Sequence, residues 1–115
     1  MKFPGRADFQ AAFGLEPEDE DPSMAYVRYV FRSNTSSLEL DVSFSGVLES
    51  FQIITRIHGS VVGSISSERT ISLVIDQDEN GTKALHVTFD IKGIVAEARI
   101  TFEPDISYQW WLINE

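Results

Sequence analysis

Strict alternation of apolar and polar residues is the feature of this sequence that most constrains its fold. Every second residue is apolar in three segments, at residues 38–44, 85–91 and 94–102. Side chains along a β-strand point alternately to its two faces, so each segment is predicted to be a strand with one buried face and one wet face. Antiparallel sheets accommodate one wet face, whereas parallel sheets are covered on both. The alternation therefore predicts an antiparallel sheet.

Two further segments have the composition of strands, and turn residues separate the strands from one another. Residues 25–32 and 71–75 are rich in β-branched and aromatic side chains. Short polar residues occupy 33–37, and Gly93 lies between two alternating segments. Asn80-Gly81 is a pair typical of a tight β-hairpin. These turns predict that strands adjacent in the sequence pair with one another.

The first predicted hairpin joins residues 25–32 to residues 38–44. Its wet face carries Arg28 and Arg32 on one strand, with acidic residues on the other. Opposite charges directly across an antiparallel pair attract one another. We therefore expect the two arginines to lie opposite Asp41 or Glu39.

Four other segments are less sharply defined. Residues 7–15 have aromatic residues at helical spacing and predict a short helix. Residues 46–58 fit one helical face but also contain many β-branched residues, and their length favours helix over strand. Residues 60–67 are small and predicted to be irregular, whereas residues 106–113 fit either a final strand or a short helix.

Together these segments predict the α+β class: a curled, mainly antiparallel meander of about five or six strands. The predicted helix at 46–58 would cover its apolar face, and a short N-terminal helix would precede it. A curled sheet that closes around its own core is the alternative. The predicted core residues are Leu40, Phe44, Leu73, Val87, Phe89 and Ile100.

Length and charge limit the function. The 115 residues fit one domain spanning 1–115. There is no cysteine, so the chain has no disulfides, cysteine-ligated metal or cysteine nucleophile. Nine basic and 18 acidic residues give a formal net charge of −9, which disfavours direct binding to nucleic acid or an anionic membrane. With no apolar N-terminal segment or long apolar run, a cytoplasmic protein is expected.

The acidic residues are concentrated in two places. Residues 16–23 form a predicted exposed loop, in which proline and like-charge repulsion oppose regular structure. The second group lies at the predicted hairpin tip. Carboxylates grouped in this way complement a basic protein surface. The predicted partner-binding acids are Glu16, Glu18, Asp19, Glu20, Asp21, Asp76, Asp78 and Glu79.

Catalytic and cofactor motifs are absent from the sequence. His86 shares a predicted wet strand face with Asp90, which is the only arrangement that resembles a general base. His58 would end the predicted helix, where the helix dipole favours a cation. The acidic hairpin tip lacks the closing glutamate of a calcium loop. We therefore predict no catalytic residue, no metal site and no cofactor.

The adjacent residues Trp110 and Trp111 would point to opposite faces of a strand. We expect one of the two to fill the core and the other to be exposed, and the alternative is that both are partly buried packing residues. Exposed tryptophan is enriched among the residues that dominate binding energy at protein interfaces. We accordingly assign Trp111 to the predicted partner-binding residues.

Several segments resemble the C-terminal half of small bacterial immunity proteins, which protect a cell from contact-dependent growth inhibition or other polymorphic toxins. The resemblance spans about two thirds of the chain. Val61 and Val62 stand where that pattern would place a tryptophan. The similar segments are Ser66 to Asp76, Asn80-Gly81, Leu85 to Phe89 and Ala98 to Glu103.

This resemblance implies a non-enzymatic, cytoplasmic inhibitor that binds one cognate toxin. The acidic surface suits a nuclease, whose phosphate-binding cleft is cationic. Two alternatives remain: a barrel-like protein that binds a small ligand, and an enzyme that uses the His86 face. A cavity lined by Phe44, Phe89 and Trp110 would favour the small-ligand protein.

Overall fold

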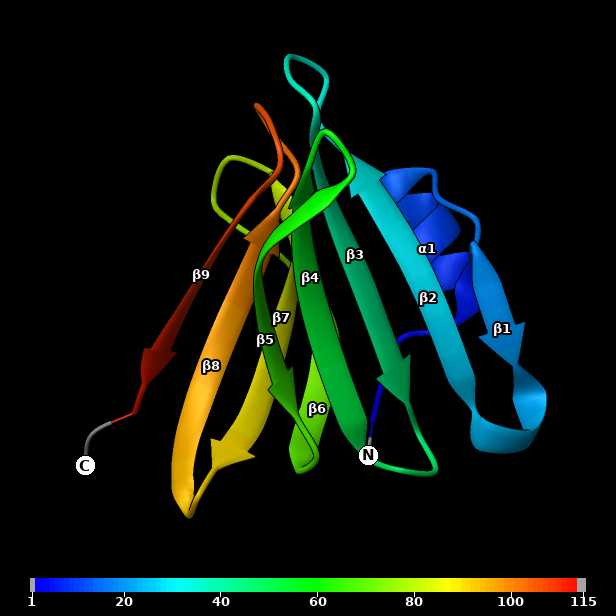
Figure 1. The fold of residues 1–115 in the computed structure, drawn as a ribbon, viewed down its shortest axis with the longest axis vertical. Coiled ribbons are helices and arrows are strands. Elements are labelled where there is room, and N and C mark those ends of the chain that lie inside the picture. Colours follow the sequence, from blue (N-terminus) through cyan, green and yellow to red (C-terminus); the bar gives the residue numbers. More distant parts are fainter. Residues whose placement is uncertain (1, 114–115) are drawn as a thin grey trace.

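A computed structural model describes residues 2–113 and places the strands in two antiparallel sheets, one of five strands and one of four (Figure 1). The strand orders are β1-β2-β3-β4-β5 and β6-β7-β8-β9. The elements are α1 (Arg6–Phe13), β1 (Asp19–Asp21), the 3₁₀ helix η1 (Pro22–Met24), β2 (Tyr26–Arg32), β3 (Leu38–Ser45), β4 (Ser50–Ile57), β5 (Ser60–Ser67), β6 (Thr70–Gln77), β7 (Lys83–Ile91), β8 (Ile94–Thr101) and β9 (Ser107–Leu112).

The division into two sheets corrects the predicted single meander. The chain leaves the five-stranded sheet at Ser67 and enters the four-stranded sheet at Thr70. Each sheet is apolar on one face, and the two faces pack against each other, so neither needs to close on itself. The closed, barrel-like alternative is therefore wrong, although the antiparallel pairing and the α+β class are confirmed.

The predicted helix over residues 46–58 is also wrong. This segment contains a turn, the strand β4 and the start of a second turn. Glu49, His58 and Gly59 have φ values of 52°, 52° and 78°, in the left-handed region that tight turns use. The many β-branched residues of β4 correctly indicated a strand. The length of 13 residues favoured a helix only because the segment also includes turn residues on both sides of β4. His58 lies in the hairpin turn between β4 and β5.

The structures of three other segments were left open or predicted incorrectly from the sequence. Residues 60–67 form β5 rather than an irregular segment, because pairing with β4 outweighs the weak strand preference of serine and glycine. Residues 107–112 form β9, the strand alternative for the C-terminal segment. Within the acidic residues 16–23, a short β1 pairs with β2 despite the expected repulsion.

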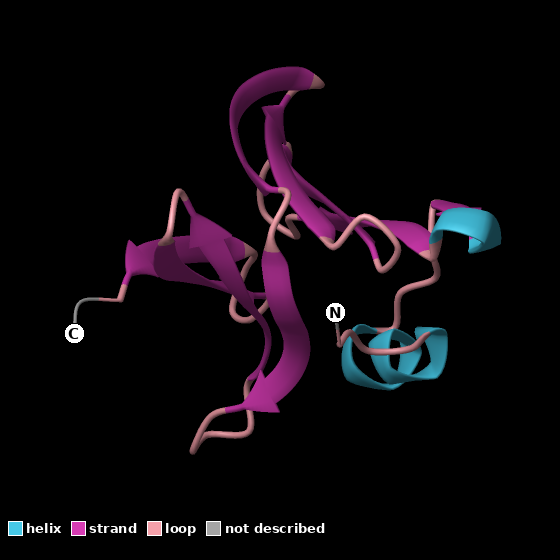
Figure 2. Ribbon diagram, turned by 90° about the horizontal axis from the view of Figure 1, so that it is seen from below, coloured by secondary structure: helices cyan, strands magenta, loops and turns pink. Residues whose placement is uncertain are grey.

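The N-terminal helix is confirmed as α1. The backbone amide of Gly5 donates to Asp8 at 2.8 Å, and Gly14 ends the helix with a φ of 67°. Phe9 is buried and stacks on Tyr29 with ring centroids 4.0 Å apart. In Figure 2, α1 lies in the angle between the five-stranded sheet and β6. The helix and the second sheet therefore provide the cover that the sequence assigned to residues 46–58.

One hydrophobic core joins both sheets and α1. All six predicted core residues are at most 1% exposed. Burial raises the pKa of Tyr29 to about 12, mainly because its hydroxyl is desolvated. The negative charge of Glu20 adds to the effect. Among the residues that the structure describes, none of the helices is long and apolar enough to span a membrane.

Candidate partner-binding surfaces

The first acidic group, Glu16 to Asp21, is partly neutralised by arginines of the same chain. The Arg6 guanidinium donates to Glu16 at 2.6 Å and lies 3.5 Å from Glu20. The bond to Glu16 raises the pKa of Arg6 above its usual value. Arg32 donates to Glu18 at 3.3 Å. Three of the five acids therefore help to attach the segment to α1 and β2.

Asp19 and Asp21 differ from those three acids. Within residues 2–113 neither forms an ion pair, and both lie on the face of the five-stranded sheet away from the core. Asp21 accepts bonds from the backbone and hydroxyl of Ser23, which fixes the start of η1. The carboxylate of Asp21 is held in place, and both acids add negative charge to this edge.

These acids lie along one rim of a concave surface of about 830 Å³ on the five-stranded sheet. Glu68 lies among the lining residues where β5 ends. Short polar side chains supply most of the floor, including Ser43, Ser45, Ser50, Gln52 and Ser66. Met24, Tyr26 and Leu48 also line it, so the surface is acidic and partly apolar. It could receive a positively charged segment of another protein.

Farther along the same face, Asp41 lies between two arginines. Arg28 and Arg56 donate to its Oδ2 at 2.9 and 2.6 Å, and Asp41 is 5% exposed. Arg28 forms the predicted ion pair with Asp41, although Ser43 lies directly opposite it in the register. Arg32 lies directly opposite Glu39, at 4.0 Å. This cluster is balanced within the chain, because a nearly buried carboxylate requires such partners.

The second predicted acidic group does not form one surface. Asp76 lies in β6 on the outer face of the four-stranded sheet, where Arg99 donates to it at 3.1 Å. Asp78 instead accepts from the backbone amides of Asn80 and Thr82, both at 2.9 Å, and shapes the hairpin tip. Glu79 is exposed at that tip. The predicted hairpin is confirmed, with a five-residue connection between β6 and β7.

His86 contacts acids on neighbouring strands rather than Asp90 on its own strand. Its Nδ1 lies 3.3 Å from Asp76, and its Nε2 lies 3.6 Å from Glu97. Asp90 accepts from the Gly93 amide at 2.8 Å instead. Glu97 was not among the predicted site residues, although the short turn at Gly93 fixes the β7–β8 register that brings it near His86. Among residues 2–113, no cluster of three His, Cys, Asp or Glu residues is arranged to hold a metal.

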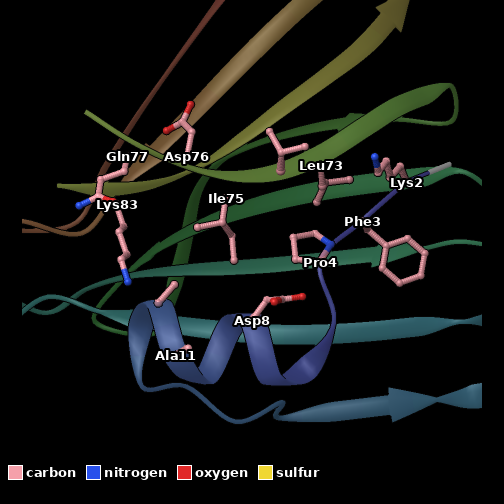
Figure 3. Close-up of a pocket in the computed structure, with 12 residues that line it drawn as sticks. Lys2, Phe3, Pro4, Asp8, Ala11, Leu73, Ile75, Asp76, Gln77 and Lys83 are labelled. Atoms are coloured by element: carbon pink, nitrogen blue, oxygen red, sulfur yellow. The ribbon is translucent and has the colours of Figure 1, made fainter. Parts of the chain in front are cut away.

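A cleft of about 500 Å³ lies between α1 and β6 (Figure 3). Leu73 and Ile75 point from β6 toward the helix, while Asp76 points away from it. The cavity that would have favoured a small-ligand protein is not formed. Phe44 and Phe89 are buried in the core, whereas Trp110 is 49% exposed at a sheet edge.

The tryptophans occupy β9, the edge strand of the four-stranded sheet. Trp110 lies beside Ala98 on the core-facing side, and Trp111 lies beside Glu97 on the outer side. The indole of Trp111 meets His86 edge-on, with ring centroids 6.1 Å apart. Trp111 is 38% exposed, so neither tryptophan is a core residue. The expectation that one would fill the core is wrong.

Both tryptophans are exposed because β9 is an edge strand. Tyr108, at the start of the strand, receives a hydrogen bond of 3.1 Å from Thr55 of the opposite sheet. Farther along β9, Trp110 and Leu112 remain about half exposed. The five-stranded sheet covers the beginning of β9 and leaves its end uncovered.

No family model and no curated protein sequence matches this chain. A solved structure does match, and it is described as a contact-dependent growth inhibition toxin–immunity protein complex from Klebsiella pneumoniae 342. The chain is 23% identical to a chain of that complex, with a TM-score of 0.85, and the match covers 97% of this chain and 96% of the other. The resemblance inferred from the sequence is therefore confirmed at the level of the fold.

Proposed function

We propose that this chain is an immunity protein that binds and neutralises the cognate toxin of a contact-dependent growth inhibition system. The observation that carries the proposal is the fold likeness, which extends over 97% of the chain at a TM-score of 0.85. The similar complex contains both a toxin and an immunity protein. A net charge of −9 favours the immunity role when the toxin attacks nucleic acid, because such an enzyme requires a cationic substrate-binding surface.

The proposed toxin is a nuclease, and the proposed mechanism is blockage of its active site. The concave surface bordered by Asp19, Asp21 and Glu68 has carboxylates where a basic cleft could contact them. These carboxylates replace substrate phosphates as partners for lysine and arginine. Opposite charge also accelerates the diffusional encounter of the two proteins. The remaining predicted contacts, among them Glu79 and Trp111, would extend the interface toward the four-stranded sheet.

The proposal includes no catalysis by this chain, and it places the protein in the cytoplasm of the cell that it protects. His86 contacts acids on two other strands, and His58 occupies a turn. A variant that combines His58→Gln with His86→Gln should therefore protect within a few fold of the wild type. Complete loss of protection by a correctly folded double variant would contradict an inhibitor role.

The proposal is tested by co-expressing the protein with the toxin domain encoded next to its gene. Cells that carry the toxin domain alone should lose viability, and cells that carry both proteins should grow. An unrelated toxin of the same class is the specificity control, and it should kill cells in either case. The purified toxin domain should degrade RNA or DNA, and an equimolar amount of this protein should stop the degradation. Growth arrest despite soluble co-expression would exclude the immunity role.

A further inference from the structure

The two sheets have four edge strands, and three of them are poorly suited to pairing with another strand. β1 has three residues, all of them acids. The edge of β6 is occupied by the N-terminal segment, where Leu73 donates to the carbonyl of Lys2 at 2.8 Å. β5 is rich in serine, contains Gly63 and pairs with β4 through a register shift. Charge, coverage and irregularity are the usual means of blocking an edge.

β9 has none of these features. Its sequence is Ser-Tyr-Gln-Trp-Trp-Leu, without charge, proline or glycine. It pairs with β8 in regular register from Ser107 to Leu112, and the pairing continues where Ile113 donates to Val95 at 2.8 Å. An uncharged and regular edge of this length is a template for strand addition.

The Ile113 bond also fixes which backbone groups of β9 point outward. In an antiparallel pair, successive residues alternate between bonding the neighbouring strand and facing away from it. Since Ile113 bonds to β8, Trp111 and Gln109 do so as well. The amides and carbonyls of Tyr108, Trp110 and Leu112 therefore face the open edge. These three residues offer up to about six hydrogen bonds to an added strand.

The side chains support the same conclusion. Trp110 and Leu112 lie on one face of the sheet and are 49% and 44% exposed, while Trp111 on the other face is 38% exposed. A partner resting on either face would cover one tryptophan and leave the other in water. A strand added at the edge has side chains on both faces, so it would contact both indoles.

We infer that β9 is the docking edge for a β-strand of the cognate toxin, which would become the fifth strand of the β6–β9 sheet. This inference rests on the proposed function. The added strand would be apolar on the side of Trp110 and would carry arginine or lysine on the other side. There the Trp111 ring can accept a cation, and Glu97 lies beside it. A net charge of −9 favours such a basic partner and opposes pairing with a second copy of this chain.

Amide hydrogen exchange of the free protein and of its complex with the toxin domain tests this arrangement. The amides of Tyr108, Trp110 and Leu112 should exchange at least about tenfold more slowly in the complex. Gln109 and Trp111, which already bond to β8, are the internal controls and should change little. Slower exchange confined to alternate residues would distinguish strand addition from general shielding of the surface.

Substitutions provide the second test. Trp110→Pro removes an outward amide as well as the indole, whereas Trp110→Ala removes only the indole. Binding should weaken by about 30-fold or more for Trp110→Pro, the equivalent of a hot-spot loss, and by less for Trp110→Ala. Val62→Ala on the β5 edge, where Val62 is 58% exposed, is the matched control and should change binding by less than about twofold. Thermal unfolding establishes that each variant is folded.

Three results would overturn the inference. If the complex forms with unchanged exchange at β9, the immunity role stands but the docking edge is elsewhere. If the toxin domain does not bind at all, both the role and the docking edge fail. If sedimentation shows a dimer of the free protein that Trp110→Pro abolishes, β9 pairs with a second copy instead.

Discussion

Two edges of this molecule, β1 and β9, are protected from indiscriminate pairing to different extents. β1 is short and acidic, and Glu18, which precedes it, accepts a hydrogen bond from Arg32 of β2. β9 is twice as long and uncharged, and its last residues expose apolar side chains. The first edge repels other strands, while the second can accept one.

The difference between these edges suggests that they affect different steps of binding. Charge acts over roughly a Debye length, about 8 Å at physiological ionic strength, so it governs how fast a partner arrives. Apolar contact and backbone pairing act only at contact, so they govern how long the partner stays. We therefore expect the β1 edge to influence association and the β9 edge to influence dissociation.

The largest expected effect is on the free energy of unfolding, which depends on the packing beneath each edge. Phe9→Ala should lower the free energy of unfolding by about 3–5 kcal/mol, because it leaves a cavity between α1 and Tyr29 beneath the β1 side. Trp111→Ala should cost less than about 1 kcal/mol, because exposed residues contribute little to folding. Urea denaturation with a constant m-value measures both. Equal losses would mean that Trp111 is primarily a structural residue.

The next effect is on dissociation of the complex with the proposed cognate toxin. Trp111→Ala should raise the off-rate by about 30-fold, which corresponds to a hot-spot loss of about 2 kcal/mol, and should leave the on-rate nearly unchanged. Surface-based kinetics with immobilised toxin domain provide the measurement. Val61→Ala is the control, since Val61 is a 60% exposed apolar residue on another edge. If the two variants dissociate at similar rates, β9 has no special role in retention.

Association should respond to the β1 edge. Replacing both Asp19 and Asp21 by asparagine should lower the on-rate by about tenfold at low salt, which is more than it raises the off-rate. Asparagine retains an oxygen that can still accept from Ser23, so the start of η1 is preserved. The same experiment at 50 and 500 mM salt should reduce the difference between variant and wild type.

Glu103→Gln, an exposed acid in the loop before β9, is the matched control for this loss of charge. It should lower the on-rate by much less for each charge removed. An on-rate that depends neither on salt nor on Asp19 and Asp21 would reduce the acidic segment to a solvated surface.

The smallest effect concerns how the loop before β9 is attached to the rest of the protein. Asp105 accepts bonds from Thr35 and Ser33, at 2.6 and 2.7 Å, and the backbone amide of Ile106 also donates to it. These bonds, led by that from Thr35, lower its pKa to about 2. A depressed carboxyl pKa contributes stability that is present above the ordinary value near 4 and is lost as pH falls toward about 2.

Asp105→Asn should therefore be less stable than the wild type at neutral pH, and the difference should shrink between pH 4 and pH 2. Thermal unfolding across that range measures it. The control is Asp90→Asn, because Asp90 lies near the end of β7 and accepts a bond from the Gly93 amide. A nuclear magnetic resonance titration of Asp105 with an ordinary midpoint would show that these bonds do not favour its charged form.

Much of the fold could be predicted from local pattern. The alternating segments form β3, β7 and β8. Gly93 lies in the predicted turn between β7 and β8, where its φ is 86°. Residues 46–58 show where this approach fails. Helical spacing and strand preference conflicted there, and β4 is a strand because its neighbours β3 and β5 pair with it. No local window contains those partners.

The candidate surfaces were predictable to different degrees. The acidic segment is evident in the sequence, but its pairing with Arg6 and Arg32 depends on how α1 and β2 meet. Asp76 and Asp78 are two residues apart, yet one is paired on a sheet face and the other shapes a turn. Adjacency in the sequence therefore did not establish a shared surface.

The sequence alone determined the antiparallel pairing, the buried face of each alternating strand, the tight turns and the excess of negative charge. These properties depend on side-chain periodicity, backbone freedom and composition, which are local or additive. Tertiary structure decided that the strands divide into two sheets after Ser67, that α1 fills the angle between them, and that β9 is an edge. The exposure of Trp110 and Trp111 follows from that edge. Burial depends on which distant element lies opposite a side chain, and residue order alone does not specify that element.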